Sequence, residues 1–400
     1  MTESLHIGVL AADLTHQHGW AHYSLSLINA LRRAGVRVTV VAARNSPTLT
    51  PQPPLPQGEG EQETSLCILP TVDPLEGGML AGLWRARAQA RAALRECDII
   101  HSLIEPYAPL AAWIAGKRPL VVTGHGSYVR ASVTRRFPVN QVYARAFRRG
   151  LMVCVSGYTA RAAEAALPGI RTAVVPNGVD VERFADLPSP PYSLSQGERG
   201  NKMGSFERRA GMPTVLSVGA VKARKGTLPL VHAMAEVRRH VPNAQCVIIG
   251  SLELEPAYVS EVEAAIRHHG LQEAVHLLGR APDDALMEWY AAADVFALPS
   301  LNVGWKFEGF GLSLLEASAA GLPVVSTRGS GTEDAVDDGA TGLLVPQDEL
   351  DTALPAALIR LLTDHALAAQ MGAAGRAKAA SLTWDNTARQ MIGIYTGLLT

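Results

Sequence analysis

The chain has 400 residues, of which 48% are hydrophobic and 18% charged, and its formal net charge is −1. This length exceeds one ordinary core and predicts two domains of about 150–200 residues each. The balanced charge argues against a nucleic-acid partner. No stretch reaches the roughly 18 uninterrupted apolar residues of a membrane span, and no basic start with an apolar run marks a signal peptide. We therefore expect a cytoplasmic protein.

In chain order, short apolar runs alternate with stretches of helical period. The first half predicts strands at 5–10, 36–42, 99–102, 119–123, 151–155 and 173–175, with helices at 20–34 and 78–95. The second half predicts strands at 213–218, 245–249, 275–278, 295–298, 323–326 and 342–345, with helices at 227–240, 256–269 and 312–320. Alternating strands and helices predict parallel sheets with helices on both faces. Because the pattern occurs twice, we expect two doubly wound α/β domains.

Two stretches, 46–65 and 187–209, interrupt this pattern. Both are poor in large apolar residues, rich in Pro, Gly and polar groups, and share the tripeptide Gln-Gly-Glu. This composition predicts inserted flexible loops rather than binding elements. The predicted domains are therefore residues 1–186, a linker at 187–210, residues 211–383, and a final helix at 384–400.

The four cysteines are widely spaced and include no C-x-x-C pair; they are Cys67, Cys97, Cys154 and Cys246. Three lie in or beside apolar runs, which favours buried free thiols. A disulfide or a zinc site is the alternative.

A cationic loop at 217–226 follows one predicted strand and opens a helix. It contains Gly219, Lys222, Arg224 and Lys225. Backbone N–H groups and positive side chains that converge at a helix N-terminus suit a diphosphate. A basic loop alone is more often simply solvated. The loop therefore indicates a phosphate site only in combination with the other motifs of the chain.

A second stretch, 308–316, runs from a strand into a helix. Its glycines allow close approach of backbone to a ligand, and the new helix offers unpaired N–H donors. Further along that helix, Glu316 is a carboxylate that can accept both hydroxyls of a ribose. It could instead be a surface residue, but its apolar neighbours Leu314, Leu315 and Ala317 make a solvated face less consistent.

Two motifs lie in the first half. Asn177-Gly178 predicts a turn, and His125 stands between two glycines at the end of the strand at 119–123. Glycine neighbours leave an imidazole accessible for catalysis or hydrogen bonding. A purely structural histidine is the alternative reading.

Taken together, these four stretches resemble glycosyltransferase family 4, a large retaining family with the GT-B fold. Asn177-Gly178-Val179-Asp180 with Phe184 is similar to the motif that closes the family's first domain. Glu308 and Glu316 have its E-x7-E spacing, with Gly-Phe-Gly between them. The resemblance covers nearly the whole chain apart from the two insertions. It implies two Rossmann-like domains facing each other across a cleft, with the last helix packed back on the first domain.

The resemblance implies roles for individual residues. Lys225 would bind the donor diphosphate, Glu316 the ribose, and Glu308 would face the transferred sugar or its leaving phosphate. His125 would lie near the sugar, positioning it or stabilising charge, so His125 and Glu308 are the catalytic candidates. The donor-binding candidates are Gly19, Gly219, Lys222, Lys225, Phe310, Gly311, Leu312 and Glu316.

Two departures from the family pattern matter. Ala220 stands where the family usually has Arg, so one diphosphate cation is missing. Lys222 or Arg224 could replace it, and we favour Lys222. The family's paired glycines are reduced to Gly19, with histidines 16, 18 and 22 nearby. These histidines would suit a metal site, but since the family binds phosphate without metal, we expect no metal and no cofactor.

The resemblance predicts a retaining, metal-independent transfer of sugar from a nucleotide-sugar donor to a carbohydrate or lipid-linked acceptor. No carboxylate nucleophile is evident, which favours a same-face displacement. Two alternatives stay open: a sugar-nucleotide epimerase on the same fold, and a GT-B binding protein that has lost turnover, which Ala220 would favour. A Rossmann dehydrogenase is disfavoured because the first strand lacks G-x-G-x-x-G.

The stretch from 106 to 163 contains no Asp or Glu. It holds nine cations: Lys117, Arg118, Arg130, Arg135, Arg136, Arg145, Arg148, Arg149 and Arg161. One interpretation of this asymmetry is attraction to an anionic acceptor or to an anionic membrane surface at the inner face of the membrane. The interpretation we favour from the sequence is a solvated helix face with acidic partners from elsewhere in the fold.

Overall fold

The computed structural model describes residues 5–12, 14, 19–44, 46, 65–72, 78–185, 187, 202–203, 206–207 and 212–400. Most of both predicted insertions lies outside these residues. The chain forms two compact units, Met1–Gly178 with Trp384–Thr400, and Val179–Thr383. The N-terminal stretch of the first unit thus ends at Gly178. The sequence prediction placed the end of that domain at residue 186.

The first unit is built on a parallel sheet with strand order β3-β2-β1-β4-β5-β6-β7. The strands are β1 (His6–Ala11), β2 (Arg37–Ala43), β3 (Ser65–Leu69), β4 (Ile99–Ser102), β5 (Leu120–Gly124), β6 (Leu151–Cys154) and β7 (Arg171–Val174). The sequence did not predict β3 and assigned Ser65 to the insertion. Residues 66–69 are a short apolar run that pairs in parallel with β2, so register with a neighbour makes this run a strand.

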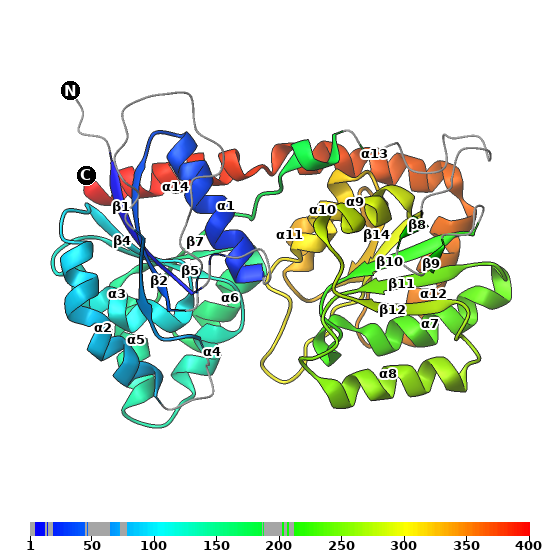
Figure 1. Ribbon diagram of the computed structural model, residues 1–400, viewed down its shortest axis with the longest axis horizontal. Coiled ribbons are helices and arrows are strands. Elements are labelled where there is room, and N and C mark those ends of the chain that lie inside the picture. The colour runs from blue at the N-terminus through cyan, green and yellow to red at the C-terminus, as the bar shows by residue number, and fades with distance from the viewer. Residues whose placement is uncertain are drawn as a thin grey trace. The chain divides into compact units, whose positions relative to one another are not determined.

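Helices cover both faces of this sheet (Figure 1). One face carries α1 (Gly19–Arg33) and α14 (Trp384–Leu399), which pack on each other. The other carries α2 (Met79–Ala93), α3 (Ala108–Ala115), α4 (Tyr128–Val133), α5 (Val139–Arg149) and α6 (Gly157–Ala166). Buried side chains such as Leu10, Ile100 and Met152 fill the space between the sheet and this second layer.

The last helix, α14, is bound to the first unit by specific contacts. The Tyr395 hydroxyl lies 2.7 Å from Nδ1 of buried His101 on β4, and Asp385 accepts from Arg33 on α1 at 2.6 Å. The Thr387 hydroxyl donates to the Pro176 carbonyl at 3.0 Å. The prediction that the C-terminal helix returns to the first domain is confirmed.

The second unit repeats the design with the parallel order β12-β11-β10-β13-β14-β15. Its strands are β10 (Thr214–Val218), β11 (Gln245–Ile249), β12 (Val275–Gly279), β13 (Val295–Leu298), β14 (Val324–Thr327) and β15 (Gly342–Val345). Of its helices, α7 (Thr227–His240) packs on α8 (Pro256–His268) and α12 (Leu350–Thr363), and α10 (Leu312–Ala319) packs on α13 (His365–Ser381). The remaining elements are the short strands β8 (Lys202–Met203) and β9 (Phe206–Glu207), α9 (Asp283–Ala292) and α11 (Thr332–Ala335).

In both sheets the strand order reverses at the first strand. The chain adds β2 and β3 to one side of β1 and then places β4 on the other side, and β10 stands in the same relation to β11 and β13. Open α/β sheets bind ligands at such a reversal, beyond the carboxyl ends of the strands. The prediction of doubly wound α/β architecture is confirmed, and in the second unit the reversal lies between β10 and β13.

All four cysteines are free thiols, and Cys97, Cys154 and Cys246 are buried as predicted. Burial raises the pKa of the Cys246 thiol to about 12, which keeps it protonated and unreactive. The three buried cysteines are packing residues.

Candidate active site

The cationic loop leaves the carboxyl end of β10 through a tight backbone turn. Gly219 has φ of 153°, and a Cβ on the neighbouring Gly250 would lie 2.0 Å from the Gly219 carbonyl oxygen. Gly226, which caps α7 in the left-handed conformation, would place a Cβ 1.9 Å from the Pro299 oxygen. Only glycine fits at these crossings. The loop is therefore held directly against the segment that follows β13.

Glu308 lies on that segment and pairs with two cations of the loop. Its Oε2 accepts from Arg224 Nη1 at 2.6 Å and from Lys225 Nζ at 2.7 Å. The Ser300 hydroxyl lies 3.3 Å from the same oxygen. The side chains of all three charged residues are largely buried, at 11–19% exposure. The reversal point of the second sheet thus holds a compact ionic cluster.

Opposing effects set the ionisation of this cluster. Burial alone would raise the pKa of Glu308, but the charges of Arg224 and Lys225 and their hydrogen bonds hold it well below its usual range. Burial lowers the pKa of Lys225, and Glu308 opposes that shift. The two cations therefore supply the counter-charge that keeps the buried Glu308 carboxylate ionised.

Lys222 precedes the ionic cluster without joining it. Among the described residues, the side chains that donate to Glu308 are those of Arg224, Lys225 and Ser300. Burial, followed by the charges of Arg224 and Lys225, lowers the pKa of Lys222 to about 8. The sequence favoured Lys222 as the replacement for the arginine missing at Ala220, whereas Arg224 is the residue placed beside Lys225.

The N-terminus of α10 lies directly after Glu308. Gly311 caps the helix in the left-handed conformation with φ of 90°, and the first helical bond runs from the Leu314 amide to its carbonyl. The amides of Leu312 and Ser313 therefore precede the intrahelical ladder. Phe310 is buried at 2% exposure and anchors the turn. The Gly331 amide donates to the Glu308 carbonyl at 2.8 Å, which fixes the turn on the loop after β14.

Glu316 lies one turn into α10 and is half-buried. Its Oε2 accepts from the Tyr290 hydroxyl on α9 at 2.9 Å. Glu316 also acts electrostatically on Lys225. The carboxylate is thus oriented by a buried phenol and shares its surroundings with the cationic loop.

His125 lies at the end of β5 in the first unit, held at two points. Its backbone N–H donates to Glu105 Oε1 at 2.8 Å. Its ring Nε2 lies 2.8 Å from the Leu103 carbonyl oxygen. A carbonyl only accepts, so Nε2 carries the proton and Nδ1 carries the lone pair. Burial lowers the pKa of His125 to about 4, with the bond to Leu103 opposing. The ring is neutral at pH 7 and offers an acceptor rather than a cation.

The predicted residues divide between the two units. The second unit brings together Lys225, Glu308 and the start of α10, while His125 and Gly19 belong to the first. Gly19 is the first residue of α1, and a Cβ added there would meet open space. Of the histidines considered for a metal, 16 and 18 lie outside the described residues, and the described part of the chain holds no group of three or more possible ligands.

Three residues that contact the candidate site residues were not predicted from the sequence: Tyr290, Ser300 and Glu105. Tyr290 carries no local signal because its partner Glu316 lies on a different helix, and nothing in the sequence marks the contact of Ser300 with Glu308 further along the same segment. Glu105 is a single acid next to a proline in an apolar stretch. That isolation is a sequence signal for a buried carboxyl group with specific partners.

Family models match both halves of the chain. The model described as Glycosyltransferase Family 4 matches residues 18–183, and that described as Glycosyl transferases group 1 matches residues 198–378. Among curated proteins, the chain is similar to a GDP-mannose-dependent alpha-(1-6)-phosphatidylinositol monomannoside mannosyltransferase of Mycobacterium tuberculosis, at 33% identity over 77% of this chain and 78% of that protein. It is also similar to a D-inositol 3-phosphate glycosyltransferase of Xylanimonas cellulosilytica, at 29% identity over 93% and 90% of the two chains.

Solved structures share the fold along almost the full length. Sucrose-phosphate synthase from Thermosynechococcus elongatus superposes with a TM-score of 0.77 at 22% identity, covering 98% of this chain and 99% of that one. HepE from Anabaena, solved with UDP-glucose, gives 0.71 at 21% identity, covering 98% and 100%. The fold is GT-B, as the resemblance predicted, and the chain belongs to glycosyltransferase family 4.

Proposed function

We propose that this glycosyltransferase transfers a sugar from a nucleoside-diphosphate donor, with retention of anomeric configuration and without a metal, to a lipid-linked acceptor bearing an anionic head group. The observation that carries the proposal is the ionic cluster of Arg224, Lys225 and Glu308 where the strand order reverses. The family resemblance supports transfer of the sugar from the nucleotide-sugar donor to the acceptor.

The cationic loop supplies the positive charge that a diphosphate needs. Arg224 and Lys225 face one carboxylate, and Lys222 adds a third positive group to the same loop. The amides at the start of α10 add the positive end of a helix dipole. As the bond to the sugar breaks, negative charge grows on the leaving phosphate, and charges already in place stabilise it without reorganisation. We therefore assign charge neutralisation to side chains and expect turnover in excess EDTA.

Glu316 suits the ribose of the donor. Tyr290 occupies Oε2 and orients the carboxylate, and Oε1 is the oxygen we assign to ribose hydroxyls. Hydrogen bonds to a charged acceptor are worth about 1.5–3 kcal/mol each. Loss of this carboxylate should therefore weaken donor binding more than it weakens folding.

His125 is assigned to the transferred sugar by the family resemblance. Because its ring is neutral with the lone pair on Nδ1, it accepts a hydrogen bond from a sugar hydroxyl and does not neutralise phosphate. With no carboxylate assigned as nucleophile, we propose that the acceptor oxygen attacks on the face from which the phosphate leaves.

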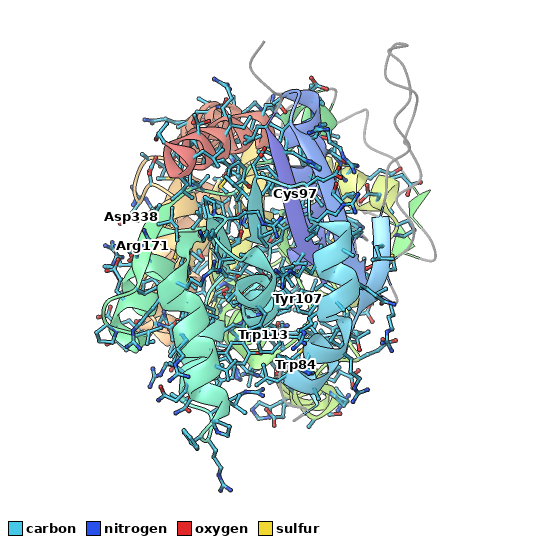
Figure 2. All side chains as sticks on the ribbon, turned by 90° about the vertical axis from the view of Figure 1, so that its left-hand side faces the viewer. Trp84, Cys97, Tyr107, Trp113, Arg171 and Asp338 are labelled. Atoms are coloured by element: carbon cyan, nitrogen blue, oxygen red, sulfur yellow. The ribbon has the colours of Figure 1, made fainter. Side chains whose placement is uncertain are left out.

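Two findings support a lipid-linked acceptor. The mycobacterial relative is named for a phosphatidylinositol mannoside acceptor. In this chain, α2, α3, α4 and α5 contain no Asp or Glu, and aromatic side chains are exposed on that layer. Figure 2 shows Trp84 and Trp113 on the neighbouring helices α2 and α3; their rings are 5.4 Å apart, and Trp84 is 53% exposed.

Further features of this layer fit a membrane surface. The Arg87 guanidinium lies 3.5 Å from the Trp84 ring centroid, and Phe137, beside Arg135 and Arg136, is 81% exposed. Exposed aromatics flanked by cations are typical of proteins that lie on anionic lipid. Within the described residues, no helix has the length and hydropathy of a membrane span. We propose peripheral contact with the inner face of the membrane.

The donor site is tested with Lys225→Ala and Glu316→Ala, assayed for turnover of a panel of nucleotide sugars. We expect a fall of about 100-fold or more for Lys225→Ala, as for removal of a preorganised charge donor. Lys378→Ala is a matched control, because Lys378 is equally buried at 17% exposure and pairs with Asp337 elsewhere in the unit. Wild-type turnover by both site variants would contradict the assignment.

The membrane contact is tested separately with vesicles of neutral or anionic lipid at low and high salt. Trp84→Ala and Phe137→Ala should reduce sedimentation with anionic vesicles and leave turnover of a water-soluble acceptor unchanged. Absence of binding to anionic vesicles at low salt would remove this part of the proposal.

A second candidate is a nucleotide-sugar-binding protein without turnover, which Ala220 favours because the usual arginine is absent. A sugar-nucleotide epimerase remains a third. Product analysis separates all three: free nucleoside diphosphate with a glycosylated acceptor indicates transfer, an isomerised donor indicates epimerisation, and thermal stabilisation by donor without product indicates binding alone.

A further inference from the structure

A buried carboxyl group lies beneath the histidine loop of the first unit. Glu105 begins a short 3-10 turn, Glu105–Tyr107, that follows β4, and its exposed fraction is 0%. The turn lies beside β5, whose carboxyl end carries His125. Buried acids are rare unless they satisfy specific partners. The contacts of this carboxyl group therefore indicate why it is there.

Backbone amides are the partners of Glu105. Oε1 accepts from the His125 amide at 2.8 Å, and the nearby amides of Gly126 and of Glu105 itself lower the pKa of the carboxyl group. Among the described residues, Oε2 has no hydrogen-bond partner. Burial raises the pKa of Glu105 to about 7, and the nearby backbone amides oppose that rise. The side chain thus binds loop backbone rather than a cation.

The loop needs an external anchor because of its glycines. Gly126 has φ of 151°, a conformation that L side chains rarely adopt. A Cβ on Gly124 would lie 3.2 Å from Cys154 Sγ, so the loop passes close to β6 with no side chain of its own there. Two contacts from the segment after β4 hold His125: the Glu105 carboxyl binds its amide, and the Leu103 carbonyl binds its ring.

We propose that Glu105 is a positioning residue for the sugar-side histidine: by accepting from the amide of His125, it keeps the imidazole on the Leu103 carbonyl with the Nδ1 lone pair available. This rests on the role assigned to His125 above. Without the carboxyl group, the His125 amide loses its acceptor, and the loop must move to satisfy it. The ring would then exchange between tautomers and lose its fixed direction.

The experiment compares Glu105→Ala with the conservative Glu105→Gln, which retains a carbonyl oxygen for the amides. Ser102→Ala is the matched control, because Ser102 is buried on β4 and also donates to the same segment, to the Ile104 carbonyl at 2.7 Å. Two readouts are used: ring 15N shifts and pH titration of His125 in protein without ligand, and kcat and KM for the donor. His125→Gln identifies the ring signal.

We expect Glu105→Ala to lose the single-tautomer signature and to move the midpoint of the His125 titration upward. We expect kcat to fall about 100-fold, the typical effect of a reacting group displaced by about 1 Å, with KM changed by less than about 3-fold. Glu105→Gln should recover most of both, and Ser102→Ala should change neither. The double variant Glu105→Ala with His125→Ala should match His125→Ala within about 2-fold, because both changes act through one ring.

An unchanged His125 ring signal in Glu105→Ala would overturn the proposal, as would additive losses in the double variant. The ring signal does not depend on turnover. If the chain proves to lack transferase activity, the proposed function fails while the ring measurement still decides whether Glu105 positions the histidine.

Discussion

Glu308 in the second unit and Glu105 in the first are both buried glutamates near a strand end, at 9% and 0% exposure. Their pKa values shift in opposite directions. Burial raises the pKa of Glu105 to about 7, whereas Arg224 and Lys225 overcome burial and hold the pKa of Glu308 well below its usual range. Burial alone therefore does not decide the charge of a buried acid, because cationic partners can overcome it.

The two units stabilise their buried polar groups by different means. The Glu308 cluster retains charge through ion pairs, which suits the binding of an anionic phosphate. The first unit keeps His101 and His125 neutral: burial lowers their pKa values to about 3 and about 4. Neutral, hydrogen-bonded groups suit recognition of sugar hydroxyls, which carry no charge. The following four predictions test this division.

The largest effect should come from breaking the ion pairs. Glu308→Ala leaves two buried cations without their counter-charge, which typically costs about 3–5 kcal/mol. Urea denaturation should show this loss of the free energy of unfolding, and nucleotide should restore part of it by supplying anionic charge. A loss below about 1 kcal/mol would mean that solvent already screens the cluster.

Next in size is the exchange of cations in the phosphate loop. Arg224→Ala should weaken binding of a nucleoside diphosphate about 10–150-fold, the equivalent of one charged hydrogen bond. Lys222→Ala, on the same loop but outside the Glu308 pairs, should weaken it by less. Isothermal titration with both variants ranks them, and a larger loss for Lys222→Ala would restore the preference drawn from sequence alone.

A smaller effect is expected from a neutral pair in the first unit. Tyr395→Phe removes the hydroxyl that contacts His101 Nδ1 and leaves that buried nitrogen without a partner, at a cost of about 1–3 kcal/mol. Because no net charge is involved, the loss should be the same at 50 mM and 500 mM salt. A strong salt dependence would contradict the neutral assignment of His101.

The smallest effect is a change in pH dependence. His101 and His125 have folded pKa values below 6.5, so the unfolded state binds more protons and acidification from about pH 6.5 destabilises the fold. Glu105 has a folded pKa of about 7, so between pH 4.5 and 7 the folded state binds one more proton and opposes this loss. Each proton contributes about 1.4 kcal/mol per pH unit.

Glu105→Gln removes the opposing proton. Between pH 5 and 6, its free energy of unfolding should therefore fall with acidification more steeply than that of the wild type, by up to about 1.4 kcal/mol per pH unit. Denaturation curves at several pH values in this range measure the difference. Parallel slopes would mean that Glu105 is ionised throughout.

The architecture and the position of the donor motif could be predicted from local sequence patterns. Periodicity is local, so alternating runs predicted the strands and helices of both units. The spacing of Glu308 and Glu316 is local too, because both lie on one turn and the helix that follows it. The departure at Ala220 was also visible without a structure.

The side chains that contact one another could be identified from the three-dimensional fold alone. Glu308 pairs with residues 83 and 84 positions away, and that contact exists because the sheet order sets β10 beside β13. The carboxyl group of Glu105 reaches His125 because β4 and β5 are neighbours. Such pairings follow from strand order and burial, which no short window of sequence encodes. These long-range pairings place Arg224, rather than Lys222, with Lys225 on Glu308. They also identify Glu105 as a partner of His125.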